Sequence, residues 1–128
     1  MNVLVVLQCG GYIVTTYSFP APDDLLPAAL MEIGAYMVES VRENFETGGR
    51  PFRWLPDSPA TVKRKHFSAP NIDTGKLMRS IGASVRGDTV IVDTETEYAG
   101  YAEAVRPYML FQRADLSAIE AIIAGYIK

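Results

Sequence analysis

The chain has 128 residues, of which 48% are hydrophobic and 21% are charged, and its formal net charge is −3. This balance is typical of a single globular domain, residues 1–128, and excludes a disordered chain. The single cysteine excludes an intramolecular disulfide framework, and the net acidity argues against a dedicated DNA-binding domain.

The first predicted element is a β-hairpin over residues 1–19. An apolar run from Val3 to Leu7 and a β-branched, aromatic run from Tyr12 to Phe19 flank Gly10-Gly11. Two strands around a Gly-Gly turn explain this pattern better than a signal peptide, because no Lys or Arg precedes the apolar run. No apolar stretch approaches the roughly 20 residues of a membrane-spanning helix, so we expect no membrane association.

A long helix is predicted next, capped by Asp23 or Asp24 and with Pro27 in its first turn. Apolar residues recur at close to helical spacing and predict one core-facing stripe: Leu26, Leu30, Ile33, Met37, Val41 and Phe45. Gly48-Gly49 is expected to end this helix, since a left-handed C-terminal residue favours glycine.

The segment 50–71 is predicted to be a largely irregular, basic connector. Ser58-Pro59 favours the start of a short helix that runs to Lys65. A second short helix, capped by Asp73 or Thr74, is expected to direct its apolar side chains inward: Leu77, Met78 and Ile81.

Another hairpin is predicted from Ala83 to Asp93, with Gly87-Asp88 as its two-residue turn. Residues 97–103 are ambiguous. Asp115 is expected to cap a C-terminal helix with an apolar stripe: Leu116, Ile119, Ile122, Ile123, Tyr126 and Ile127. The order of elements predicts a small α+β domain, in which a mainly antiparallel sheet packs against the long helix and the C-terminal helix.

The residues that usually perform catalysis or bind metals are scarce. One histidine and one cysteine, far apart in sequence, cannot form a nitrogen and sulfur metal site. Asp93, Glu95 and Glu97 are spaced two residues apart, so on a strand their carboxylates would lie on one face and could bind Mg²⁺ or Ca²⁺. A solvent-exposed strand end is the preferred interpretation. His66 follows a basic run and is expected at the surface, and Cys9 is expected to be a small buried residue. We therefore predict no enzymatic activity, no metal and no cofactor.

The charge is unevenly distributed. Residues 23–46 hold six acids and one arginine, whereas residues 50–79 hold seven bases and two acids. The acidic helix and the basic connector are either neighbours within one chain, or partners in a head-to-tail contact between copies. Trp54 is either an interface residue or a lid on the core. The candidate interface residues are Arg50, Arg53, Trp54, Lys63, Arg64, Lys65, Glu39, Glu43 and Glu46.

Several motifs, in this order and spacing, resemble one known family. They are Phe45-x-x-Gly48-Gly49-x-Pro51-x-x-Trp54, Ser58-x-x-Thr61, Asp73-Thr74-Gly75-x-Leu77-x-x-Ser80-Ile81, Tyr98-Ala99 and Arg106-Pro107-Tyr108-Met109-Leu110. Over roughly residues 30–127, the chain resembles the tailed-phage virion morphogenesis (tail completion) family.

The resemblance implies a structural protein of the virion neck, assembled in the host cytoplasm, that completes the tail and stabilises head–tail joining. It implies a homo-oligomeric ring, commonly sixfold, which contacts tail-tube, tail-terminator and head-connector subunits while DNA passes through the lumen. The chain departs from the family in a shorter segment after Tyr98-Ala99 and in its N-terminal hairpin, which suggests a strand that extends a neighbour's sheet. The alternative is a small nucleic-acid-binding module that uses the basic residues of segment 50–66.

Overall fold

The computed structural model describes residues 1–54, 76–96 and 99–127. Its elements are β1 (Asn2–Cys9), β2 (Tyr12–Pro20), α1 (Pro27–Glu46), α3 (Lys76–Ser80), β3 (Gly82–Arg86), β4 (Thr89–Asp93), α4 (Ala99–Val105) and α5 (Arg113–Gly125). They form a small α+β domain with a mostly antiparallel four-stranded sheet, which confirms the predicted fold class.

The strands are ordered β2-β1-β4-β3 across the sheet. Each predicted hairpin forms an antiparallel pair, β1 with β2 and β3 with β4. The two hairpins are joined by a parallel pairing of β1 with β4, which aligns Leu4 with Thr89 and Leu7 with Val92. The sheet therefore has β2 at one edge and β3 at the other.

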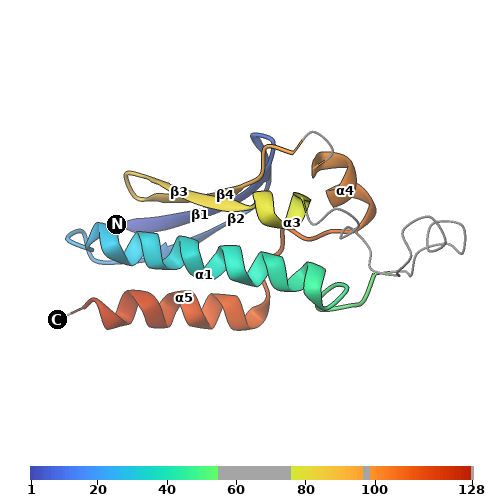
Figure 1. Cartoon of the computed structure of the whole chain (residues 1–128). Helices are drawn as coiled ribbons and strands as arrows, with labels where there is room; N and C mark the ends of the chain where they lie inside the picture. Colours follow the sequence, from blue (N-terminus) through green and yellow to red (C-terminus); the bar gives the residue numbers. More distant parts are fainter. Residues whose placement is uncertain (55–75, 97–98, 128) are drawn as a thin grey trace, which may run out of the picture.

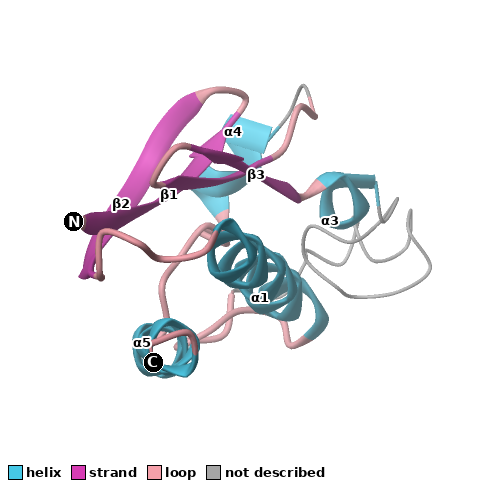
Figure 2. Cartoon of the chain, turned by 90° about the vertical axis from the view of Figure 1, so that its left-hand side faces the viewer, coloured by secondary structure: helices cyan, strands magenta, loops and turns pink. Residues whose placement is uncertain are grey.

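Helices α1 and α5 build layers on one face of the sheet (Figure 1 and Figure 2). Figure 1 shows α1 lying along the sheet and α5 running beside α1, with both chain termini at the same end of the molecule. Figure 2, seen nearly down these two helices, places α1 between the sheet and α5. Gly34 allows the close approach of α1 to the sheet, because an added Cβ would lie 2.9 Å from the Ala83 Cβ.

The core lies between α1 and the two central strands. The predicted stripe of α1 is buried from Leu30 to Phe45, whereas its first member, Leu26, is 53% exposed. The sheet contributes Val3, Val5, Leu7, Val90 and Val92, and the C-terminal helix contributes Ile119 and Ile123. Cys9 is buried among them, as predicted.

The predicted cap of α1 is wrong. Neither Asp23 nor Asp24 caps the helix; the N-cap is Leu26, which makes no side-chain capping bond. Pro27 at the first helical position explains this, because a residue that precedes proline is held in the extended region, where Leu26 lies at φ −68° and ψ 141°.

The predicted cap of α5 is also displaced. The N-cap is Gln112, and Asp115 lies three residues further on, where it completes a reciprocal capping box with Gln112. The helix predicted from Ser58 to Lys65, and the capping residues Asp73 and Thr74, lie outside the described residues. The ambiguous stretch after Glu97 contains the short helix α4. No helix in the described ranges is long and apolar enough to span a membrane.

Candidate functional site

The end of α1 is fixed by two glycines, as predicted. The Gly48 N–H donates to the Phe45 carbonyl and the Gly49 N–H to the Asn44 carbonyl, at 3.3 and 2.7 Å, which is the Schellman arrangement. Both glycines have positive φ, 79° and 113°. A Cβ on Gly49 would lie 2.8 Å from the Trp54 nitrogen, so the chain turns back here through a space that only glycine fits.

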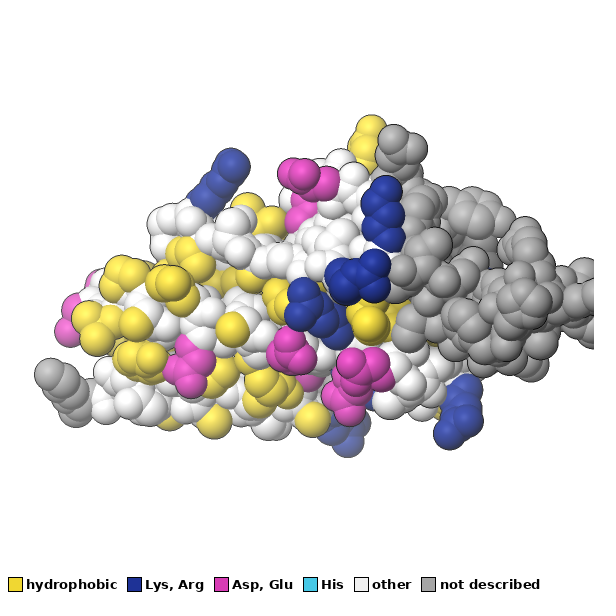
Figure 3. Space-filling model, in the orientation of Figure 1, with side chains coloured by type: hydrophobic (Ala, Val, Ile, Leu, Met, Phe, Trp, Pro, Cys, Tyr) yellow, Lys and Arg dark blue, Asp and Glu magenta, His cyan; other side chains and the backbone are white. Residues whose placement is uncertain are grey.

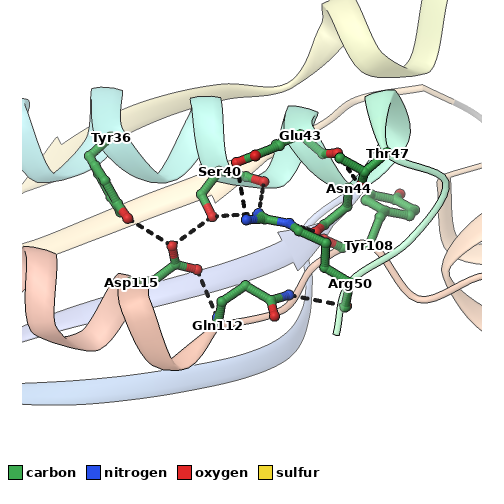
Figure 4. A network of polar contacts seen from close by, with 9 residues as sticks. All are labelled: Tyr36, Ser40, Glu43, Asn44, Thr47, Arg50, Tyr108, Gln112 and Asp115. Carbon is green, nitrogen blue, oxygen red and sulfur yellow. Dashed lines mark hydrogen bonds and ion pairs between the residues drawn. The ribbon is translucent and has the colours of Figure 1, made fainter. Parts of the chain in front are cut away.

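Arg50 follows this turn and points back onto the last turns of α1 (Figure 4). Its Nε donates to the Asn44 Oδ1 at 2.9 Å, and its Nη2 donates to the Ser40 carbonyl at 2.6 Å. Its Nη1 lies 3.0 Å from a Glu43 carboxylate oxygen. The Arg50 side chain is only 24% exposed, so water competes little for these hydrogen bonds, and they fix the position of the residue.

Asp115 extends the same network into α5. This carboxylate is 1% exposed. One of its oxygens accepts hydrogen bonds from the Tyr36 hydroxyl, at 3.0 Å, and from the Ser40 hydroxyl, at 2.8 Å. Its other oxygen accepts the backbone N–H of Gln112 at 2.7 Å. Figure 4 shows how the network joins α1, the chain after α1 and the start of α5.

An aromatic cluster lies next to this network. Phe45 packs edge-on against Trp54, with ring centroids 5.7 Å apart, and its ring is tilted against that of Tyr108, with centroids 4.9 Å apart. The Trp54 indole N–H donates to the Pro107 carbonyl at 3.0 Å. Asn44 donates to the Tyr108 carbonyl at 2.7 Å. Segments 45–54 and 107–108, far apart in sequence, are thus held together at one end of α1.

The structure places the candidate interface residues as follows. Arg50 and Trp54 make the contacts within the chain described above. Glu39, Glu43 and Glu46 lie together around a shallow depression on α1, and Glu39 pairs with Arg42 at 3.2 Å. Arg53 is exposed. Lys63, Arg64 and Lys65, like His66, lie outside the described residues.

These positions bear on the two interpretations of the uneven charge, a contact within one chain and a contact between copies. The ion pair of Arg50 with Glu43 joins the basic segment to the acidic helix within one chain, as the first interpretation expects. Arg53 and Glu46 remain available for a contact between copies, because both are exposed.

Two buried groups have perturbed pKa values. Burial raises the pKa of the Cys9 thiol, which lies 3.3 Å from the Tyr108 hydroxyl. Burial also raises the pKa of Tyr108, whose hydroxyl donates to the Ala99 carbonyl at 2.9 Å. Such a thiol is a poor nucleophile, because the reactive form is the thiolate.

Glu103 is another partly buried group whose pKa is raised. Burial raises the pKa of its carboxyl group, even though that group accepts the N–H groups of Tyr108 and Met109, at 3.2 and 2.7 Å. In the ranges that the structure describes, no three His, Cys, Asp or Glu side chains come together as metal ligands. Asp93, from the alternating acids, instead accepts a hydrogen bond from Gln8 at 2.9 Å.

Sequence reasoning missed the polar members of the network: Tyr36, Ser40, Asn44, Gln112 and Asp115 as a buried carboxylate. One signal was present. Ser40 and Asn44 lie four residues apart, on the α1 face that the stripe predicts to be near the core, and a buried polar side chain needs partners.

Comparison with known proteins gave no match: no family model, no curated protein and no solved structure matches the chain.

Proposed function

We propose that the protein is a structural subunit of the neck of a tailed bacteriophage, which forms a ring, completes the tail and stabilises head–tail joining. The proposal begins from the sequence motifs, whose order and spacing resemble the tail-completion family. In this role the chain provides shape and contact surfaces.

One observation carries the proposal. Four motif residues lie together at the end of α1: Phe45 packs against Trp54 and Tyr108, and Gly49 leaves the space that the Trp54 backbone occupies. Side chains held by packing in this way are those expected of a scaffold, whose shape depends on how the chain closes on itself. The cluster supports the motif resemblance because two of the motifs, at 45–54 and 106–110, meet in one structural unit although they are far apart in sequence.

The oligomeric part of the proposal is supported by the surface. Large apolar side chains are exposed on β2 and α1, among them Tyr12 at 82% and Met31 at 66%. Exposed apolar surface of this kind is typical of proteins that assemble. In the ring, we expect a neutral to acidic lumen, along which DNA slides, because a dense basic lining would bind the phosphates.

The proposal is tested by inactivating the gene in the phage or prophage genome that carries it. The expected result in electron micrographs of the lysate is DNA-filled heads and separate tails, with joined virions restored by the wild-type gene supplied in trans. A lysate of infectious virions without the protein would contradict the proposal.

A second measurement separates the proposed role from nucleic-acid binding. Fluorescence anisotropy with labelled duplex DNA should show no specific binding at physiological salt. Micromolar affinity that weakens steeply as salt rises would favour the nucleic-acid-binding module instead. Arg53→Ala is the informative variant, since Arg50 is held by contacts within the chain.

A further inference from the structure

Both edges of the sheet carry features of strands that pair with another chain. β2 reads Tyr-Ile-Val-Thr-Thr-Tyr-Ser-Phe-Pro and β3 reads Gly-Ala-Ser-Val-Arg, so only the last residue of β3 is charged. Monomeric proteins usually protect an edge strand with inward-pointing charges, lysines or a central proline. Neither strand has a lysine, an inward-pointing charge or a central proline; β2 has one β-bulge, at Val14, and in the described part of the chain each strand pairs on one side only.

The β3 edge is accompanied by an apolar groove. The groove has a volume of about 600 Å³ and lies between α1 and the strand, lined by Met31, Ala35, Val38, Ile81 and Val85 among others. Figure 3 shows hydrophobic side chains gathered over the same part of α1. Helix α1 and β3 thus present an apolar groove at this edge of the sheet, next to the position that one more strand would occupy.

The charged side chains at the groove are already paired. Arg42 donates to the carbonyls of Met78 and Ile81, at 3.3 and 3.1 Å, and pairs with Glu39 at 3.2 Å. A strand placed over the groove would therefore bury no unpaired charge, which would otherwise cost several kcal/mol. An uncharged strand is the fitting occupant.

The β2 strand supplies apolar side chains on the matching face. Tyr12 pairs with Cys9 and Tyr17 with Val5, both core residues, so the two tyrosines point to the helix side of the sheet. They are nevertheless 82% and 44% exposed. At roughly 150–250 Å² for a whole aromatic side chain, the pair exposes about 200–300 Å², or roughly a third of what each partner buries in a standard interface.

We propose that copies of the chain associate head to tail, with β2 of one copy adding to β3 of the next and its tyrosines covering the α1–β3 groove. This inference rests on the ring of the proposed function and assigns its contact surface. The topology supports a ring: β2 and β3 both run antiparallel to the central strands, so they run in the same direction. A rotation that preserves strand direction brings the two together in parallel, and the assembly closes into a ring when that rotation divides a full turn evenly.

The experiment uses the full chain and three lysine variants. Tyr12→Lys alters β2, the strand that is added, and Ala35→Lys alters the groove that receives it. Ala121→Lys, at an exposed position of α5, is the matched control. Self-association is measured by light scattering after size-exclusion chromatography, from micromolar to millimolar concentration, and folding by circular dichroism. We expect the wild type and the control to associate alike, and each of the other variants to associate about tenfold more weakly or worse.

Mixing the two interface variants provides the sharpest outcome. A Tyr12→Lys copy keeps an intact groove and an Ala35→Lys copy keeps an intact β2, so the mixture should form heterodimers and stop there. If only Tyr12→Lys weakens association, two β2 strands pair about a two-fold axis and the inference is wrong. A wild type that stays monomeric at every concentration also overturns it. If neither variant weakens self-association, the β2–β3 contact is wrong but a ring can still form through another surface. The proposed function itself is tested separately, by the head–tail joining assay.

Discussion

Replacing Arg50 by alanine removes the side chain that ties the chain after α1 to the helix itself. The substitution deletes hydrogen bonds to the Asn44 side chain and to the Ser40 carbonyl and hydroxyl, together with the ion pair to Glu43. If Arg50 acts mainly within the chain, the variant should lose stability as an isolated monomer. If it acts mainly between copies, the variant should lose assembly and keep its stability.

The magnitude follows from the burial of the partners. Asn44 is 0% exposed, and a buried acceptor that loses its partner costs about 1–3 kcal/mol. The Glu43 side chain is 53% exposed, so its ion pair adds roughly 0–1 kcal/mol. Water entering beside the partly exposed arginine site offsets some of this cost. We expect a net loss of about 2 kcal/mol, or about 8 °C in Tm for a chain of this size.

The assay is urea unfolding of the isolated chain, followed by the fluorescence of Trp54, the only tryptophan. Arg53→Ala is the matched control and should change the free energy of unfolding by less than about 0.5 kcal/mol, because that side chain is exposed. Glu43→Gln isolates the ion pair and should cost less than about 1 kcal/mol. An Arg50→Ala variant as stable as Arg53→Ala would refute the reasoning.

Three other predictions concern the same end of the molecule. Gly49→Ala should lower the free energy of unfolding by about 2–3 kcal/mol, because a Cβ there meets backbone atoms at 2.8 Å and φ is positive. Gly48→Ala should cost only about 1 kcal/mol, because a Cβ there meets nothing within 4 Å. Urea unfolding measures both losses, and equal losses would contradict the steric contact at Gly49. Trp54→Phe should cost about 1 kcal/mol, since it keeps the packing and loses the indole hydrogen bond; because this variant lacks the fluorescent residue, its urea unfolding is followed by circular dichroism, and a loss above about 3 kcal/mol would show a larger role in packing. Burial raises the pKa of Cys9, so the contribution of its protonated thiol to stability is fully present below the ordinary thiol pKa and declines as pH rises above it; the urea midpoint should therefore fall as pH rises from about 8 to about 10, and a Cys9→Val variant should show a smaller fall.

The local elements could be predicted from the sequence because their signals are local. The 3.6-residue spacing from Leu30 to Phe45 predicted α1, and glycines at the turns predicted both hairpins. The parallel pairing of β1 with β4 could not be predicted in this way. It joins Val5 to Val90 across most of the chain, and nothing within either strand specifies a partner so distant.

The candidate site was harder to predict for a related reason. Charge sums located an acidic helix and a basic segment, but a sum does not distinguish a contact within a chain from one between chains. Arg50 is brought to Glu43 by the turn at Gly48 and Gly49, and the geometry of a turn decides which side chain points back. Asp115 was predicted as the N-cap and is instead the third residue of the helix, because the helix begins at Arg113; one of its oxygens completes the capping box and the other accepts hydrogen bonds from α1.

The fold and the proposed interface use different residues, and this separation has a consequence for assembly. The network of Arg50 and Asp115 and the cluster around Trp54 determine where the chain leaves α1, whereas Tyr12 and Ala35 lie exposed on elements that are already fixed. Substitutions in the first group should lower the free energy of unfolding and weaken assembly only as a secondary effect. Substitutions in the second group should weaken assembly at unchanged stability. Measuring both quantities for one variant of each group, Arg50→Ala and Ala35→Lys, therefore tests the division directly, since a single shared surface would make the two quantities change together.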